Sequence, residues 1–139
     1  MNIKSILPNS GIDRELVTFS QNEMPSLTYK IDTDRSCITG NTKDAEAVLQ
    51  AAYLILNTER YEYPIYSHNY GIELWDLYGK PRNYVLSELK RRISEALTQD
   101  ERIISVDGWS FHTIKNAVIV SFVIHTIFGD INASKEVAA

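Results

Sequence analysis

Residues 57–79, NTERYEYPIYSHNYGIELWDLYG, are the most informative stretch of the chain. This stretch carries five of the eight tyrosines, together with Trp75 and the triplet Thr58-Glu59-Arg60. Tyrosine and tryptophan bring a large contact area with few rotatable bonds and keep a polar atom, so binding surfaces favour them. The composition predicts a surface that another protein covers, and it indicates binding more readily than catalysis.

The tyrosines of this stretch can also be interpreted as core residues. A small α+β domain can bury a single tyrosine such as Tyr53, Tyr63 or Tyr70 for packing alone. One short loop, however, cannot direct a whole set of rings inward. The residues predicted to make a protein contact are Glu59 and Arg60 as a polar anchor, with Tyr61, Tyr63, Tyr66 and Tyr70 as the aromatic part.

Amphipathic helices are predicted on both sides of the tyrosine-rich stretch. The first helix is expected to be capped by Asn41 or Thr42 and to end near residues 58–60. Residues 71–78 indicate a short helix or helical turn, and Pro81 suits the first position of a second long helix.

Each long helix is expected to bury one apolar stripe, because its apolar residues recur at steps of three and four. The stripe of the first helix is Ala45, Val48, Leu49, Ala52, Ile55 and Leu56. The stripe of the second is Val85, Leu86, Leu89, Ile93, Ala96 and Leu97. The residues expected largely outside are Lys90, Arg91, Arg92 and Glu95.

Strands are predicted near both ends of the chain. Residues 27–31 alternate as in a half-buried strand, and residues 36–39 indicate a short return strand. Residues 103–114 and 117–128 flank Lys115-Asn116 and predict a long hairpin. The expected cross-strand pairs are Trp109 with Phe122 and Phe111 with Val120. The predicted fold class is α+β, with two main helices packed on a small, mostly antiparallel sheet with a long C-terminal β-hairpin.

The chain is long enough, at 139 residues, for one domain with its own core and is short for two. Residues 1–24 show no sustained period and predict an extended N-terminal arm. A single domain is expected over 25–131, followed by a flexible polar tail over 132–139.

Composition narrows the classes of partner. The chain is 44% hydrophobic and 23% charged, which is ordinary for a globular protein. Its net charge of −4 favours neither nucleic acid nor an anionic membrane, and no run approaches the roughly 18 to 20 apolar residues of a membrane helix. No signal peptide is recognisable and Cys37 is the single cysteine, so a protein of the cytosol, or one assembled from it, is expected.

Catalytic and cofactor signatures are scarce. There is no glycine-rich phosphate loop, and the three histidines, His68, His112 and His125, lack metal-ligand spacing. We therefore expect no cofactor and no metal. The basic cluster Lys90-Arg91-Arg92 is interpreted as a solvated helix face rather than a nucleic-acid site.

Carboxylates are the remaining catalytic option. Glycoside hydrolysis uses two carboxyl groups about 5 to 9.5 Å apart, and Glu59, Glu73 and Asp76 could converge if the loop folds back. Carboxylates beside guanidinium groups, such as Glu59 next to Arg60, are more often structural. We expect no enzyme, with a peptidoglycan hydrolase as the alternative.

The residues also resemble a known family. The order Thr58-Glu59-Arg60, Pro64, Tyr70-Gly71, Leu74 and Leu77, between two helices and before a hairpin, is similar to the lysozyme-like baseplate wedge family of contractile phage tails, which includes the type VI secretion component TssE. The XkdS-like branch of PBSX-type prophages and related bacteriocin particles is closer. The segments that carry this resemblance are 25–29, 56–61, 66–71 and 123–129.

The resemblance implies a structural sheath initiator, present in several copies in the baseplate of a symmetric virion or tail-like particle. Its expected partners are wedge proteins and the tail sheath subunit. The family's Glu-Pro-Arg motif binds the wedge core, and Glu59-Arg60 stands in its place here, without the proline. For strand exchange with the sheath, the expected residues are Val118, Val120, Phe122 and Ile124. A free-standing peptide-binding module remains an alternative.

Overall fold

The computed structural model describes residues 26–138, which form two helices and two antiparallel sheets. Strands β1 (Thr28–Asp32) and β2 (Cys37–Thr42) make a two-stranded ribbon, which leads into α1 (Asp44–Leu56). The short 3-10 helix η1 (Trp75–Leu77) precedes α2 (Arg82–Leu97). Strands β3 (Ile103–Ile114), β4 (Ala117–Thr126) and β5 (Gly129–Ala138) then form a sheet in that order.

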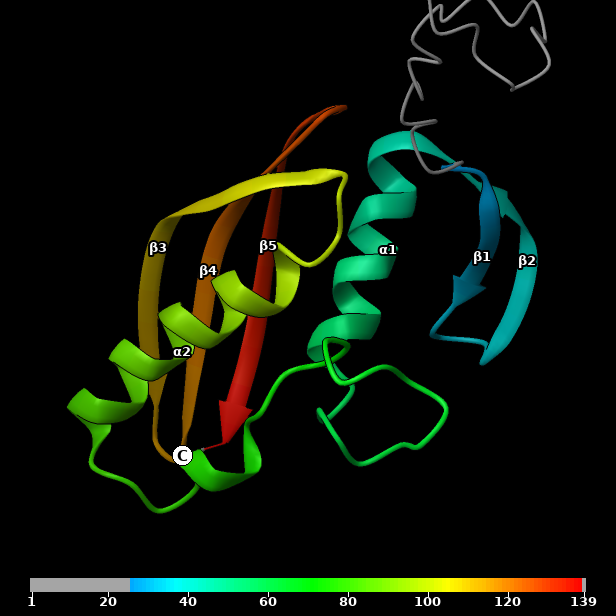
Figure 1. The fold of residues 1–139 in the computed structure, drawn as a ribbon. Coiled ribbons are helices and arrows are strands. Elements are labelled where there is room, and N and C mark those ends of the chain that lie inside the picture. The colour runs from blue at the N-terminus through cyan, green and yellow to red at the C-terminus, as the bar shows by residue number, and fades with distance from the viewer. Residues whose placement is uncertain (1–25, 139) are drawn as a thin grey trace, which may run out of the picture.

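The two helices are placed differently on the three-stranded sheet. Figure 1 shows α2 crossing the sheet, whereas α1 runs beside β5 and separates the sheet from the ribbon of β1 and β2. The predicted α+β class, with two main helices and antiparallel strands, is confirmed, and the N-terminal ribbon forms a sheet of its own. The predicted arm, residues 1–24, lies outside the described residues.

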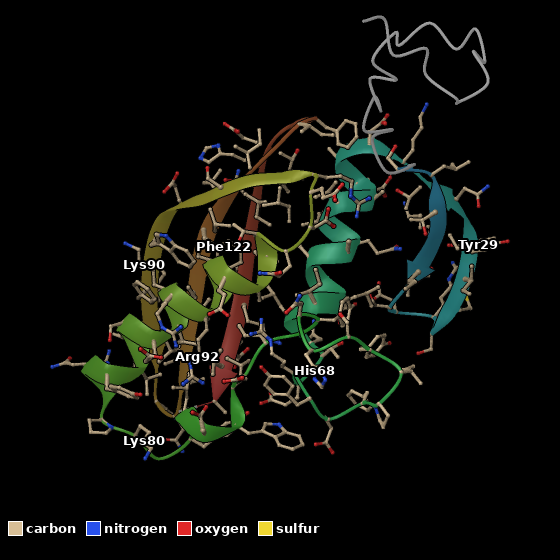
Figure 2. The ribbon with its side chains drawn as sticks, in the orientation of Figure 1. Tyr29, His68, Lys80, Lys90, Arg92 and Phe122 are labelled. Atoms are coloured by element: carbon tan, nitrogen blue, oxygen red, sulfur yellow. The ribbon has the colours of Figure 1, made fainter. Side chains whose placement is uncertain are left out.

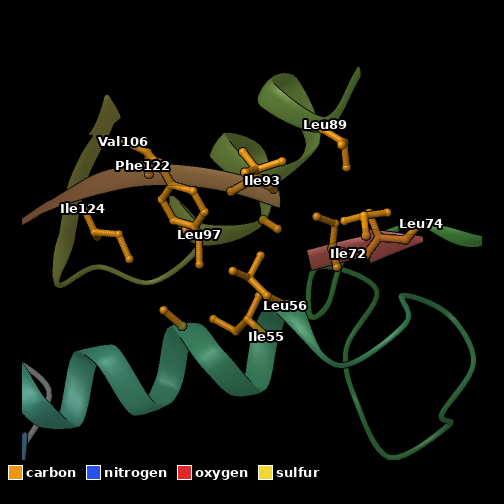
Figure 3. Close-up of a cluster of buried hydrophobic side chains, with 14 of the residues drawn as sticks. Ile55, Leu56, Ile72, Leu74, Leu89, Ile93, Leu97, Val106, Phe122 and Ile124 are labelled. Carbon is orange, nitrogen blue, oxygen red and sulfur yellow. The ribbon is translucent and has the colours of Figure 1, made fainter. Parts of the chain in front are cut away.

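The core lies between the two helices and the inner face of the three-stranded sheet. Figure 3 shows Phe122 of β4 beside Leu97 and Ile93 of α2, with Ile55 and Leu56 of α1 completing the cluster. The side chains of β4 alternate strictly between buried and half-buried along the strand. Of the predicted helical stripes, Leu49 is an exception, because its side chain is 39% exposed.

The end of the chain differs from the prediction of a flexible tail. Residues 129–138 form β5, which pairs with the whole of β4 in ten consecutive pairs without a register shift. Its inward positions are Ile131, Ala133, Lys135 and Val137. A small residue and an amphipathic lysine weaken the apolar alternation, so the sequence pattern did not reveal the strand.

The N-terminal ribbon also differs from its prediction. The apolar side chains of Leu27, Tyr29 and Ile31 are 64%, 69% and 38% exposed, so this strand is not half-buried. Hydrogen bonds hold the ribbon on α1. The side-chain amide of Gln50 accepts from the N–H of Ile31 (2.9 Å) and donates to the carbonyl of Tyr29 (2.8 Å).

Helix boundaries shift slightly from those expected. The cap of α1 is Lys43, which makes no side-chain capping bond, and the helix ends at Leu56. Pro81 is the cap of α2 and lies just before its first residue, Arg82. Among the described residues, no helix is long and apolar enough to cross a membrane.

The hairpin of β3 and β4 has the predicted first strand and a second strand that ends earlier, at Thr126. Phe111 pairs with Val120 as predicted. Trp109 contacts Phe122, with ring centroids 5.3 Å apart, although the register shifts between Asp107 and Ser110.

Replacing Phe122 by alanine tests this packing. The ring is 2% exposed at the centre of the core, so we expect Phe122→Ala to lower the free energy of unfolding by about 3 to 5 kcal/mol. Guanidinium unfolding followed by circular dichroism measures the change. The control is Val123→Ala on the outer face of the same strand, where a much smaller loss is expected; equal losses would contradict this core.

Candidate functional site

The two ends of the loop between the helices are joined by backbone hydrogen bonds, and this junction, residues 58–60 with 71–72, is called the neck below. The N–H of Ile72 donates to the carbonyl of Thr58 (3.0 Å), and the N–H of Arg60 donates to the carbonyl of Ile72 (3.1 Å). Gly71 has a φ of +95°, and a Cβ there would lie 2.6 Å from the Thr58 carbonyl oxygen. Only glycine fits this close approach without a shift of the backbone. Residues 61–70, called the aromatic loop below, therefore project from a fixed base.

Glu59 acts within the neck. Its carboxylate accepts from the N–H of Leu74 at 3.0 and 3.1 Å and from the N–H of Trp75 at 3.3 Å. These donors belong to the start of η1, where a carboxylate satisfies N–H groups that have no partner within the helix. Glu59 therefore fixes η1 to the end of the preceding segment.

Arg60 turns away from Glu59 and towards α2. Its side chain is 11% exposed, its Nε donates to the Gly71 carbonyl at 3.3 Å, and its Nη1 lies 3.1 Å from Oε1 of Glu95. The structure brings these two site residues together in the neck but gives them different partners. Arg60 forms its ion pair with Glu95 and not with Glu59.

Arg92 is the residue of the site that sequence reasoning missed. Its side chain was expected on a solvated face, yet it is 10% exposed. Its Nη1 donates to the Glu73 carbonyl (2.8 Å), and its guanidinium contacts both oxygens of Asp76 at 2.5 and 3.0 Å. Figure 2 shows Arg92 between α2 and the short helix η1. The available signal was its spacing, three residues after Leu89 on the buried stripe.

Two of the three candidate carboxylates, Glu59 and Asp76, are occupied by structural bonds. The hydrogen bond from Arg92 holds the pKa of the Asp76 carboxyl below its ordinary value of 3.8. A general acid requires the opposite shift. With Glu59 bound to backbone N–H groups, this arrangement does not favour acid–base chemistry. In residues 26–138, no group of three or more His, Cys, Asp or Glu has a metal-binding arrangement.

The aromatic loop is exposed and ordered by ring contacts. Tyr61, Tyr63 and Tyr66 are 63%, 51% and 44% exposed. The ring of Tyr66 stacks on that of Tyr70 at 4.5 Å, and Tyr63 meets Tyr66 edge-on at 6.1 Å. Tyr70 packs against the core, and its burial raises the pKa of its hydroxyl. Tyr70 thus supports the loop, while the other three offer ring surface.

The residues predicted for strand exchange lie elsewhere than expected. Val118, Val120, Phe122 and Ile124 are all buried, and their strand, β4, is the central one of the sheet. Both edges of β4 are paired, so these residues cannot form an open edge in this fold. The outer edges of the sheet belong to β3 and β5.

The contact between α2 and η1 can be tested at Arg92. Arg92→Met is expected to lower the free energy of unfolding by about 1 to 3 kcal/mol at pH 7, because it removes charged hydrogen bonds. The 62% exposure of Asp76 keeps the loss below that of a fully buried pair. Arg91→Met, on the exposed face of the same helix, is the control and should lower the free energy of unfolding much less, because solvent screens the ion pairs of Arg91.

The stability lost in Arg92→Met depends on pH, and the direction of this dependence follows from the pKa of Asp76. The pKa of Asp76 is lowered in the folded state, so its contribution is complete above the ordinary value of 3.8 and is lost as the pH falls through the folded pKa. The difference in free energy of unfolding between the wild type and Arg92→Met should therefore narrow below about pH 4, and Glu88, whose carboxylate also accepts from Arg92 and whose pKa is lowered by Arg91 and Arg92, contributes to the narrowing. Urea unfolding at a series of pH values measures it, and a constant difference would refute the Asp76 assignment.

Comparison with known proteins agrees with the resemblance noted in the sequence. Residues 27–129 match the family model described as contractile injection system sheath initiator, and this range includes the neck, the aromatic loop and both helices. A similar protein is the phage-like element PBSX protein XkdS of Bacillus subtilis (strain 168). It is 39% identical over 119 residues, which cover 83% of this chain and 80% of the relative. The chain belongs to the contractile injection system sheath initiator family.

Proposed function

We propose that this protein is a structural baseplate component that joins the wedge of a contractile phage tail or tail-like particle to its first sheath ring. The family match over residues 27–129 carries this proposal. It is supported by two separate surfaces, the aromatic loop and an open sheet edge. The protein then acts in several copies within the baseplate, on a particle assembled in the bacterial cytoplasm.

The aromatic loop is the proposed contact with the wedge proteins. Tyr61, Tyr63 and Tyr66 offer exposed rings, which stacking and the neck hold in place. Because the loop is already ordered, binding costs less conformational entropy. Glu59 and Arg60 serve this contact by fixing the base of the loop.

The sheath contact is proposed at the edge of β5, by addition of a strand from the sheath subunit. Strand β3 is less suited, because its pairing with β4 has two register shifts and such bulges protect an edge. Strand β5 runs without a shift along β4. A regular edge leaves a row of N–H and C=O groups that an incoming strand can pair.

The alternative of a peptidoglycan hydrolase has less support. Members of the matched family are sheath initiators, which are structural tail components, and two of the three candidate carboxylates, Glu59 and Asp76, are bonded to backbone N–H groups and to Arg92. A free-standing peptide-binding module would use the same surfaces, but it would not purify with tail particles.

The wedge contact is tested with the double variant Tyr63→Ser/Tyr66→Ser. We expect it to fold and to lose incorporation into baseplates, because the exposed rings are removed while the neck remains. Particle purification with immunodetection of this protein measures incorporation. Tyr84→Ser, an equally exposed tyrosine on α2, is the control and should be incorporated normally. Normal baseplates from the double variant would refute the loop assignment.

The sheath contact is tested with Ala133→Pro and Ser134→Pro on β5. Neighbouring N–H groups of a strand point to opposite edges, so one proline breaks the bond to β4 and the other removes only a donor of the open edge. The first should lower the melting temperature. The second should keep it and yield baseplates without sheaths in electron micrographs. Full sheaths from the stable variant would contradict strand addition at β5.

A further inference from the structure

A groove follows the open edge of β5. It has a volume of about 400 Å³. Residues 132–136, five in a row, line one side of it, so the groove runs along the strand. The other side is α1, through Leu49, Tyr53 and Leu56 among others. Figure 1 shows α1 and β5 side by side.

A second hollow, of about 350 Å³, lies between α1 and the N-terminal ribbon and shares Leu49 and Tyr53 with the first. Here the strand edge is not free. The amide of Gln50 bonds to both Ile31 and Tyr29 on the side of β1 that faces the helix, much as a neighbouring strand would. Of these two hollows, the one beside β5 is therefore suited to strand addition.

Lys135 places a positive charge on the inward side of the groove beside β5, whereas Glu136, the other charged residue of the lining, is exposed on the outer face of the strand. Lys135 occupies an inward position opposite Val120 and is half-buried. Its Nζ donates to the side-chain oxygen of Asn57 at 2.6 Å, and burial lowers the pKa of its ammonium group. Among residues 26–138, no carboxylate lies within ion-pair distance of it; the ion pairs formed there involve other residues.

An added strand would cover Lys135 further. Burying a charge without a partner is costly, and a carboxylate on the incoming strand offsets the cost. We propose that the groove between α1 and β5 selects an extended segment of the sheath subunit that carries an Asp or Glu side chain, and that Lys135 binds this carboxylate. This inference rests on the proposed sheath contact and adds the partner's chemistry.

A simpler role for Lys135 predicts a different result. An inward-pointing lysine on an edge strand discourages indiscriminate pairing between sheets. If that were its whole role, an apolar residue at position 135 would bind the sheath subunit as tightly as lysine or more tightly. If Lys135 selects a carboxylate, the apolar residue weakens binding.

The test uses the purified full chain and the sheath subunit of the same particle in a binding titration. We expect Lys135→Met to weaken binding about tenfold and Lys135→Glu by more, while Lys135→Arg stays within a few-fold of the wild type. Lys115→Glu, the same charge change at the exposed hairpin turn, is the matched control and should bind normally. Thermal unfolding of each variant verifies the fold.

A charge exchange identifies the partner residue. Each Asp and Glu of the sheath subunit is replaced singly by lysine, and one replacement should bind Lys135→Glu more tightly than it binds the wild type. Unchanged binding by Lys135→Met, or no compensating replacement, would overturn the inference. If the proline variants of β5 still abolish sheaths in that case, strand addition stands and only the role of Lys135 fails. No binding by the wild type would overturn both.

Discussion

The contact between Arg92 and the segment around η1 is the constraint on which the placement of the aromatic loop depends. The guanidinium reaches Glu73 and Asp76 from α2, so the return of the long loop is fixed to a helix that is itself part of the core. Arg60 makes a second link, to Glu95 one turn further along α2. Apart from η1 and the bridge between Glu59 and Ile72, the segment between the long helices has no regular structure, and its contacts with α2 hold it in place.

This arrangement explains how exposed rings can be presented without a strand or helix beneath them. A loop that orders only on binding loses conformational entropy at that moment, which weakens the complex. Here Tyr70 is anchored in the core, Tyr66 stacks on it, and Tyr63 meets Tyr66 at its edge. These ring contacts connect the core to the tip of the loop and hold the exposed rings in place in the chain by itself.

The sequence predicted those elements whose own pattern is strong. The stripe of α2 and the alternation of β4 follow from apolar spacing alone, and both helices and the hairpin were found. Three features depend on partners distant in sequence; spacing from Leu89 indicates the buried face of α2 for one of them, Arg92, but it does not reveal the residue that Arg92 binds. Arg92 is buried because its guanidinium binds Asp76. Strand β5 forms because it pairs with β4 along its whole length. Tyr29 is exposed because nothing in the described residues covers the ribbon.

An open edge and a specific partner impose different physical demands. Main-chain hydrogen bonds give affinity to any extended segment, so the regular edge of β5 cannot by itself distinguish a sheath strand from another. Discrimination requires side chains that penalise the wrong partner. On this edge the half-buried charge of Lys135 can do so, because an apolar strand would cover it without compensation. The same residue that keeps the edge from indiscriminate pairing would then admit one strand.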